Sequence, residues 1–124
     1  MDLNRVTLIG NLTGDPQSTP PASRKGHAVV SFTLATNYRW DDAGTSKESV
    51  EFHDVVAYGK LGEIISHYVK QGSKVYIEGR LRTGTWEDSS GKSRTTTEIV
   101  ADNLIMLGHR GRRETPLRPK QGER

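Results

Sequence analysis

The sequence contains no cysteine, which excludes disulfide bonds and thiolate-bound metal sites and leaves the redox compartment open. No hydrophobic run is long enough to span a bilayer, and the first residues lack the basic head and long apolar segment of a secretory signal. Aromatic residues are scarce, with two Phe, two Trp and four Tyr among 124 residues. With 32% hydrophobic residues, the chain has enough apolar material for one modest core, and we expect a soluble intracellular domain.

Positive charge is also scarce outside the C-terminal end. The chain carries a net charge of +3, but residues 109–124 hold six Lys and Arg against two Glu, a net charge of +4. Residues 1–108 therefore hold 12 basic against 13 acidic side chains, and any attraction for phosphate must come from local clusters or from the C-terminal end. Apolar content falls after Gly108 while Gly, Arg and Pro increase, which predicts a folded domain over 1–108 and a basic disordered tail over 109–124.

Five segments rich in Val, Ile, Thr and aromatic residues are predicted to form β-strands. They are residues 5–10, 28–36, 50–58, 74–82 and 95–107. In the fourth segment, Val75, Ile77, Gly79 and Leu81 fall on one face and alternate with polar or large side chains, which is the pattern of a half-buried strand.

One helix is predicted between the third and fourth of these strands. Apolar residues recur there at helical spacing, at Leu61, Ile64, Ile65, Tyr68 and Val69. Gly72 is expected to stop the helix in a left-handed conformation. Five strands with a single helix in this place follow the order of an all-β OB-fold, a small closed Greek-key barrel that often binds oligonucleotides, although other small barrels give a similar pattern.

Four aromatic residues lie in strand-like segments crowded with polar side chains. Trp40 and Trp86 each precede a pair of acidic residues, which places them near strand ends where large side chains are seldom buried. Exposed flat rings suit nucleobases. Phe52 and Tyr58 share strand parity with a valine, so a core stripe is an equal alternative for them, although Asp54 on the same face favours partial exposure.

Several blocks of the sequence resemble, in the right order, the bacterial-type single-stranded DNA-binding proteins. The blocks are NRVTLIGNL (4–12) with Asp15-Pro16, FTLAT (32–36), EFHDVVAYGKL (51–61), GSKVYIEGRLRT (72–83), Trp86, TTEIV (96–100) and MLG (106–108). The resemblance covers essentially all of residues 3 to 108, and several blocks in the right order are more specific than any single motif.

The resemblance implies an OB-fold homotetramer that wraps single-stranded DNA without sequence preference during replication, recombination and repair, in the bacterial cytoplasm at the nucleoid, with no metal or cofactor. It implies base stacking on four aromatics, Trp40, Phe52, Tyr58 and Trp86, and phosphate contacts by four basic residues, Arg5, Lys60, Arg82 and Arg94. It implies a structural or subunit-contact role for His53. Tyr38 and Tyr76 are expected to be surface or subunit-contact residues. Without the resemblance, the basic residues would be interpreted as ordinary solvated charges.

The sequence also departs from the family pattern. The family usually has a tryptophan at Phe52, a basic residue at Asp54 and an Arg-Lys pair at Gly84-Thr85, and all three changes are expected to weaken ssDNA binding or make it more salt-sensitive, with partial compensation by the basic tail. Family members also commonly end in an acidic, hydrophobic tip that recruits replication and repair proteins. This sequence lacks that tip, which indicates either a specialised paralogue or a shortened chain.

Other functions have less support. The four histidines (His27, His53, His67 and His109) show no metal-ligand spacing, and there is no phosphate-binding glycine loop, so we expect no enzyme. A primosome-type OB protein that acts mainly as a protein-docking dimer stays an alternative. A structural OB module that binds protein or oligosaccharide is a second one.

Overall fold

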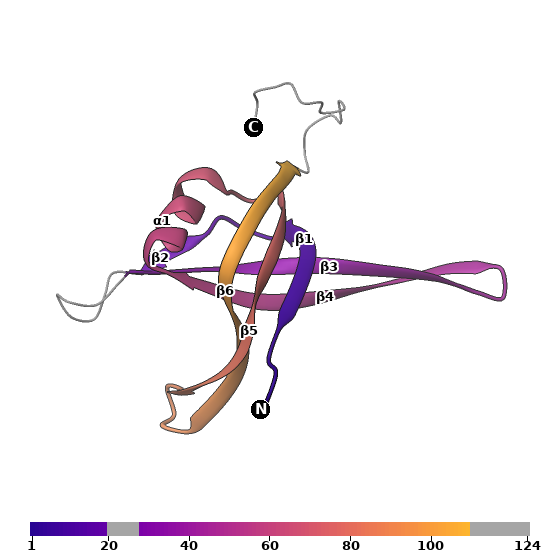
Figure 1. The fold of residues 1–124 in the computed structure, drawn as a ribbon. Coiled ribbons are helices and arrows are strands. Elements are labelled where there is room, and N and C mark those ends of the chain that lie inside the picture. The colour runs from indigo at the N-terminus through magenta and orange to yellow at the C-terminus, as the bar shows by residue number, and fades with distance from the viewer. Residues whose placement is uncertain (20–27, 110–124) are drawn as a thin grey trace.

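The computed structural model describes residues 1–19 and 28–109 (Figure 1). They form six strands and one helix, namely β1 (Val6–Leu12), β2 (Gln17–Thr19), β3 (Val29–Asp42), β4 (Thr45–Tyr58), α1 (Gly59–Tyr68), β5 (Ser73–Glu87) and β6 (Ser93–His109). β6 therefore ends one residue beyond the predicted domain boundary at 108, and the rest of the predicted tail lies outside the described residues.

Five of the strands close into a barrel. β1 pairs antiparallel with β5 on one side and with β3 on the other, where Leu12 lies opposite Leu34. β3 pairs with β4, and β5 pairs with β6. The ring is completed by a short parallel contact between β4 and β6, with Val55 opposite Ile99. This connectivity, with one helix between β4 and β5, is that of the OB-fold and confirms the predicted fold class.

Two antiparallel ribbons extend from the barrel in different directions, β3–β4 and β5–β6 (Figure 1). The predicted strands were too short here, because β3 continues to Asp42 and β5 to Glu87. Ala43 and Gly44, both with positive φ, form the two-residue turn at the tip of the β3–β4 ribbon. Such a turn matches strand twist and lets the ladder run to the end of the ribbon.

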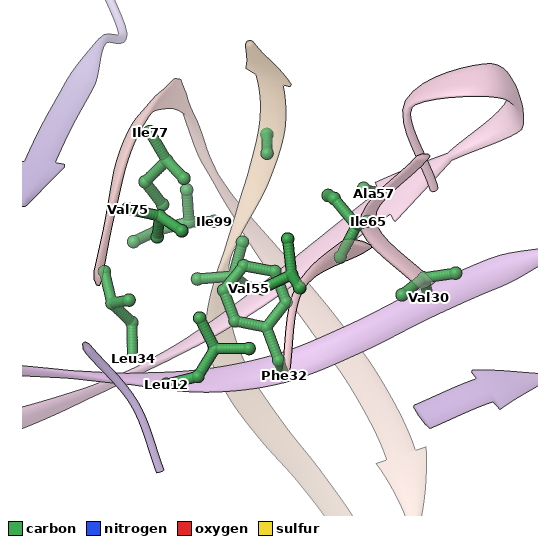
Figure 2. Close-up of a cluster of buried hydrophobic side chains, with 12 residues drawn as sticks. Leu12, Val30, Phe32, Leu34, Val55, Ala57, Ile65, Val75, Ile77 and Ile99 are labelled. Carbon is green, nitrogen blue, oxygen red and sulfur yellow. The ribbon is translucent and has the colours of Figure 1, made fainter. Parts of the chain in front are cut away.

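The barrel interior is filled by aliphatic side chains from every strand of the ring, together with Phe32 (Figure 2). Leu34, Val75 and Ile77 have no exposed surface. The predicted half-buried pattern of β5 is confirmed from Val75 to Gly79. It fails at Leu81, which is 47% exposed and lies beyond Gly79, the last residue of β5 that pairs with β1.

The helix α1 packs on the barrel through Ile65, which is fully buried, and through the adjoining Val69. Of its other predicted apolar positions, Leu61 packs half-buried against the core, while Ile64 and Tyr68 are exposed. Gly72 has positive φ as expected, but it does not end the helix. It lies in the following turn, where its N–H donates to the carbonyl of Leu12, 3.0 Å away.

Gly79 lies where β5 and β6 approach closely at a β-bulge. The register passes from Glu78 opposite Asn103 to Gly79 opposite Ala101, which leaves Asp102 as the extra residue of β6. A Cβ atom at Gly79 would lie 2.2 Å from the carbonyl oxygen of Val100. The backbone there must move to accept any side chain.

We therefore expect Gly79→Ala to lower the free energy of unfolding by about 1–3 kcal/mol, the usual cost of overpacking. Gly84→Ala is the matched control on the same strand, because the nearest atom to its Cβ would be the Glu98 carboxylate at 3.6 Å. Urea unfolding of both variants measures the difference. Equal destabilisation would show that the close approach at Gly79 does not decide its residue type.

Candidate nucleic-acid interface

All four predicted stacking residues expose their rings. The exposed fraction is 41% for Trp40, 66% for Phe52, 36% for Tyr58 and 50% for Trp86. Phe52 and Tyr58 are therefore not part of a core stripe in this chain, and the inward positions of β4 are taken by Val55 and Ala57. The surface offers flat apolar rings to a ligand on both ribbons.

The rings of the β3–β4 ribbon do not share one face. The register between these strands is continuous, with Trp40 opposite Lys47 and Phe52 opposite Ala35. Because side chains alternate along a strand and paired residues share a face, Trp40 and Phe52 lie on opposite faces of the ribbon. A single-stranded nucleic acid wrapped around this ribbon can meet aromatic rings on both of its faces.

Tyr38, expected from the sequence to be a surface or subunit-contact residue, lies against the ring of Trp40. Its ring stacks on Trp40 with centroids 5.7 Å apart and an interplanar angle of 23°, and it is 66% exposed. The two residues are two positions apart on β3, so strand parity alone places them on the same face. Tyr38 supports the indole and extends its apolar surface.

Tyr58 and Arg82 come together from different strands. The Arg82 guanidinium donates to the Tyr58 hydroxyl at 2.5 Å and lies over the ring, 5.4 Å from its centroid. It also donates twice to Glu98, at 3.1 Å from Nε and 2.6 Å from Nη2. Hydrogen bonding to Glu98, followed by that to Tyr58, raises the pKa of Arg82. Arg82 is thus fixed beside an aromatic ring, but a carboxylate already partners its charge.

Trp86 and Arg94 are cross-strand partners at the tip of the β5–β6 ribbon. The Arg94 Nε donates to Asp88 at 2.8 Å, and Asp88 also accepts from the backbone N–H groups of Ser90 and Lys92. The pKa of Asp88 is lowered to about 2, most by the bond from Arg94 and then by the bonds from the Ser90 hydroxyl and the Lys92 N–H. Because that pKa is depressed, the bonds that order this turn persist as pH falls until about 2.

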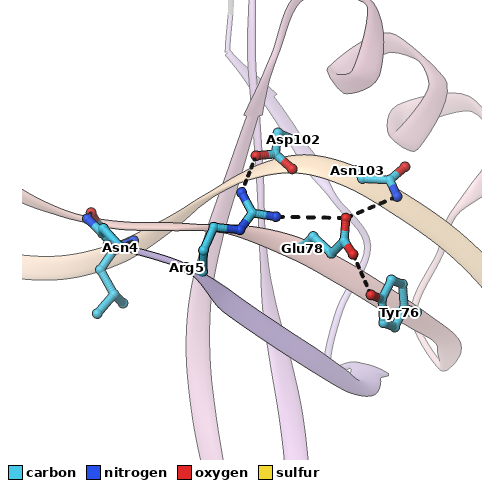
Figure 3. A network of polar contacts seen from close by, with 7 residues as sticks. Asn4, Arg5, Tyr76, Glu78, Asp102 and Asn103 are labelled. Carbon is cyan, nitrogen blue, oxygen red and sulfur yellow. Dashed lines mark hydrogen bonds and ion pairs between the residues drawn. The ribbon is translucent and has the colours of Figure 1, made fainter. Parts of the chain in front are cut away.

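Arg5 lies in a polar network on the outer surface of the barrel (Figure 3). Its guanidinium is 3.0 Å from Asp102, the bulge residue, and 3.8 Å from Glu78. Glu78 in turn accepts from the Tyr76 hydroxyl at 2.5 Å, a bond that raises the pKa of Tyr76. Arg5, like Arg82 and Arg94, is therefore paired with carboxylates within the chain.

Two predicted residues lie apart from these clusters. Lys60 is exposed in the first turn of α1 and has no ion pair within residues 1–19 and 28–109. His53 is half-buried, and its Nε2 lies 2.9 Å from the Thr36 hydroxyl. The predicted subunit-contact residues His53 and Tyr76 thus each have a polar partner in their own chain.

Within residues 1–19 and 28–109, no three His, Asp or Glu side chains gather closely enough to hold a metal ion. No helix in this part of the chain is long and apolar enough to cross a membrane.

A closed five-stranded barrel with exposed rings on projecting ribbons is typical of OB-fold binding domains. The chain belongs to the single-strand binding protein family, whose model matches residues 3–107. It is 48% identical over 108 residues to single-stranded DNA-binding protein 1 of Chlorobaculum tepidum, a match that covers 86% of this chain and 65% of that protein. The chain therefore spans slightly less than two thirds of the length of this relative.

The fold is also similar to a solved structure, a Plasmodium falciparum SSB complex with ssDNA. The TM-score is 0.75 at 31% sequence identity, over 86% of this chain and 97% of that one. The similarity thus extends over almost the whole of that SSB chain.

Proposed function

We propose that this protein binds single-stranded DNA without reading a defined sequence, and that it protects the strand during replication, recombination and repair in the bacterial cytoplasm. The observation that carries the proposal is the exposure of Trp40, Phe52, Tyr58 and Trp86 on the surface of an OB-fold barrel and its two ribbons. Stacking on such rings is tolerant of sequence, because every base has a π-face. The family match and the similarity to an SSB complex with ssDNA support the same ligand.

The proposed role is binding rather than catalysis, and it needs no cofactor. Stacking would supply about 1–3 kcal/mol per base. The ionic contribution would be smaller than the number of basic residues suggests, because Arg5, Arg82 and Arg94 already have carboxylate partners. We infer that the protein depends on its aromatic rings more than on its charge.

The direct test is a fluorescence titration of the full chain with oligo-dT. Because Trp40 and Trp86 are the only tryptophans, quenching on addition of oligo-dT would report contact at the proposed stacking sites. Duplex DNA of the same length is the control, since its bases are already stacked. An unchanged tryptophan signal would contradict the proposal and favour an OB module that binds protein or oligosaccharide.

Salt dependence separates Lys60, which has no ion pair within the described residues, from the paired arginines. We expect Lys60→Gln to reduce the slope of log K against log salt concentration by about 0.7, the value for one phosphate contact on a single strand. Arg94→Gln should change the slope less. A phosphate that binds Arg94 displaces Asp88, and the released carboxylate then takes up a cation from solution, which offsets the cation released from the DNA. Equal changes in the two variants would show that the ion pair with Asp88 does not persist in solution.

We further propose a homotetramer. The supporting observation is an apolar row on the outer face of the barrel, where Ile9 and Ile105 are both about half exposed and flank Tyr76 through the pairings of β1, β5 and β6. Sedimentation equilibrium of the full chain tests this assembly. A dimer would favour the primosome-type alternative.

A further inference from the structure

Asp54 is an acidic side chain on the surface that carries two of the proposed stacking residues. It lies on β4 two residues after Phe52 and four before Tyr58, so all three side chains share one face of the strand. Asp54 is exposed, and Thr33, its cross-strand partner, donates to Oδ1 over a long 3.5 Å contact. The ring of Phe52 stands opposite the small Ala35 and is the most exposed of the four rings.

The carboxylate of Asp54 differs from those of the neighbouring clusters. Glu98, Asp88 and Asp102 are each held by an arginine. Asp54 has no ion pair within residues 1–19 and 28–109. Its charge is therefore available to a ligand, and it repels phosphate.

The position of this charge restricts how a strand can lie on β4. A phosphate beside Asp54 would be unfavourable, so the bases of the DNA rather than its sugar-phosphate backbone should face this part of β4. Alternate residues of a strand are about 7 Å apart, so a base stacked on Phe52 brings its edge within reach of the Asp54 carboxylate. That edge must offer hydrogen-bond donors, because an ionised carboxylate only accepts.

The four bases differ in what they can offer there. Cytosine and adenine carry an exocyclic amine, and guanine carries an amine beside a ring N–H. Thymine has one ring N–H between two carbonyl oxygens, which a carboxylate repels. Asp and Glu accept from the cytosine amine in protein–DNA contacts for this reason.

We propose that Asp54 makes this protein discriminate by base composition, favouring amine-bearing bases over thymine at the position stacked on Phe52. The inference rests on the proposed binding of single-stranded DNA and adds a preference to it. Asp54 is thus a specificity-determining residue, while the aromatic rings provide affinity for every base.

The test compares the affinities of the full chain for dC15 and dT15, measured by anisotropy of labelled oligonucleotides at fixed salt concentration. The quantity of interest is the ratio of the dT15 to the dC15 dissociation constant. We expect Asp54→Asn to lower this ratio by about fivefold, the low end of discrimination by a base contact, because the site is exposed. An asparagine amide both donates and accepts, so thymine is no longer repelled.

Glu51→Gln is the matched control. It removes the same charge from β4, but its side chain is exposed on the opposite face of the strand. A general electrostatic effect would raise the affinity for both oligonucleotides in both variants and leave the ratio unchanged, and that result would overturn the inference. Failure of the wild-type protein to bind either oligonucleotide would instead contradict the proposed function itself.

Discussion

Replacing both tryptophans by alanine, Trp40→Ala with Trp86→Ala, is expected to weaken binding of single-stranded DNA by about 2–6 kcal/mol. Each base stack is worth about 1–3 kcal/mol, and effects at separated sites add. The two residues lie on ribbons that extend from the barrel in different directions (Figure 1), so neither ring can take over the stacking of the other. Anisotropy of a labelled oligonucleotide measures the loss, since the variant has no tryptophan left to report it.

Tyr68→Ala is the control for loss of exposed aromatic surface. Tyr68 is 65% exposed on α1, and this helix lies away from both ribbons (Figure 1). Its removal should leave affinity within about twofold of wild type, a change of less than 0.5 kcal/mol. A double tryptophan variant that binds as tightly as Tyr68→Ala would show that the indole rings do not contact bases.

The second large effect concerns stability. We expect Leu34→Ala to reduce the free energy of unfolding by about 2–5 kcal/mol, because it removes a fully buried side chain and leaves a cavity. Leu34 lies opposite Leu12 where β1 pairs with β3, so its neighbours belong to strands already fixed by pairing and can relax little. The loss is a large fraction of the 5–15 kcal/mol typical of a domain.

Leu81→Ala provides the matched comparison, since the same atoms are removed from a side chain that is 47% exposed. Its cost should stay below about 1.5 kcal/mol, because less surface returns to water and no cavity forms. Urea unfolding at one fixed protein concentration compares the variants, since any subunit association contributes to apparent stability. Similar costs for both leucines would contradict the placement of Leu34 in the buried core.

The barrel strands and the helix could be predicted because their residues face an apolar core on a regular period. Val75 and Ile77 alternate with polar neighbours, and Ile65 and Val69 recur at helical spacing. The ribbon arms could not be predicted in the same way. Thr45 to Glu48 form a strand with both faces exposed, so only the pairing with β3 specifies them, and that pairing cannot be seen in the composition.

β2 was missed for a related reason. Gln17, Ser18 and Thr19 are all exposed and hold no apolar side chain, and they form a strand only because β3 offers an unpaired edge. Such a strand depends on a partner that is distant in the sequence.

The aromatic part of the candidate site could be predicted from the sequence, while its electrostatics could not. Polar neighbours mark Trp40 and Trp86 as exposed, and the structure agrees. Arg5, however, pairs with Asp102, which is 97 positions away in the sequence and lies at a bulge that no local sequence pattern predicts. The pairing of Arg5 and Arg82 with carboxylates of other strands is therefore a result of the fold.

The continuous ladder of the β3–β4 ribbon also limits how its length can vary. Lengthening each arm by two residues between the barrel and Trp40 would carry the indole farther out and keep it on its present face. Lengthening each arm by one residue would turn the same indole to the side on which Phe52 now lies. Homologues and engineered versions should therefore change the reach of this arm in steps of two, with the barrel left untouched.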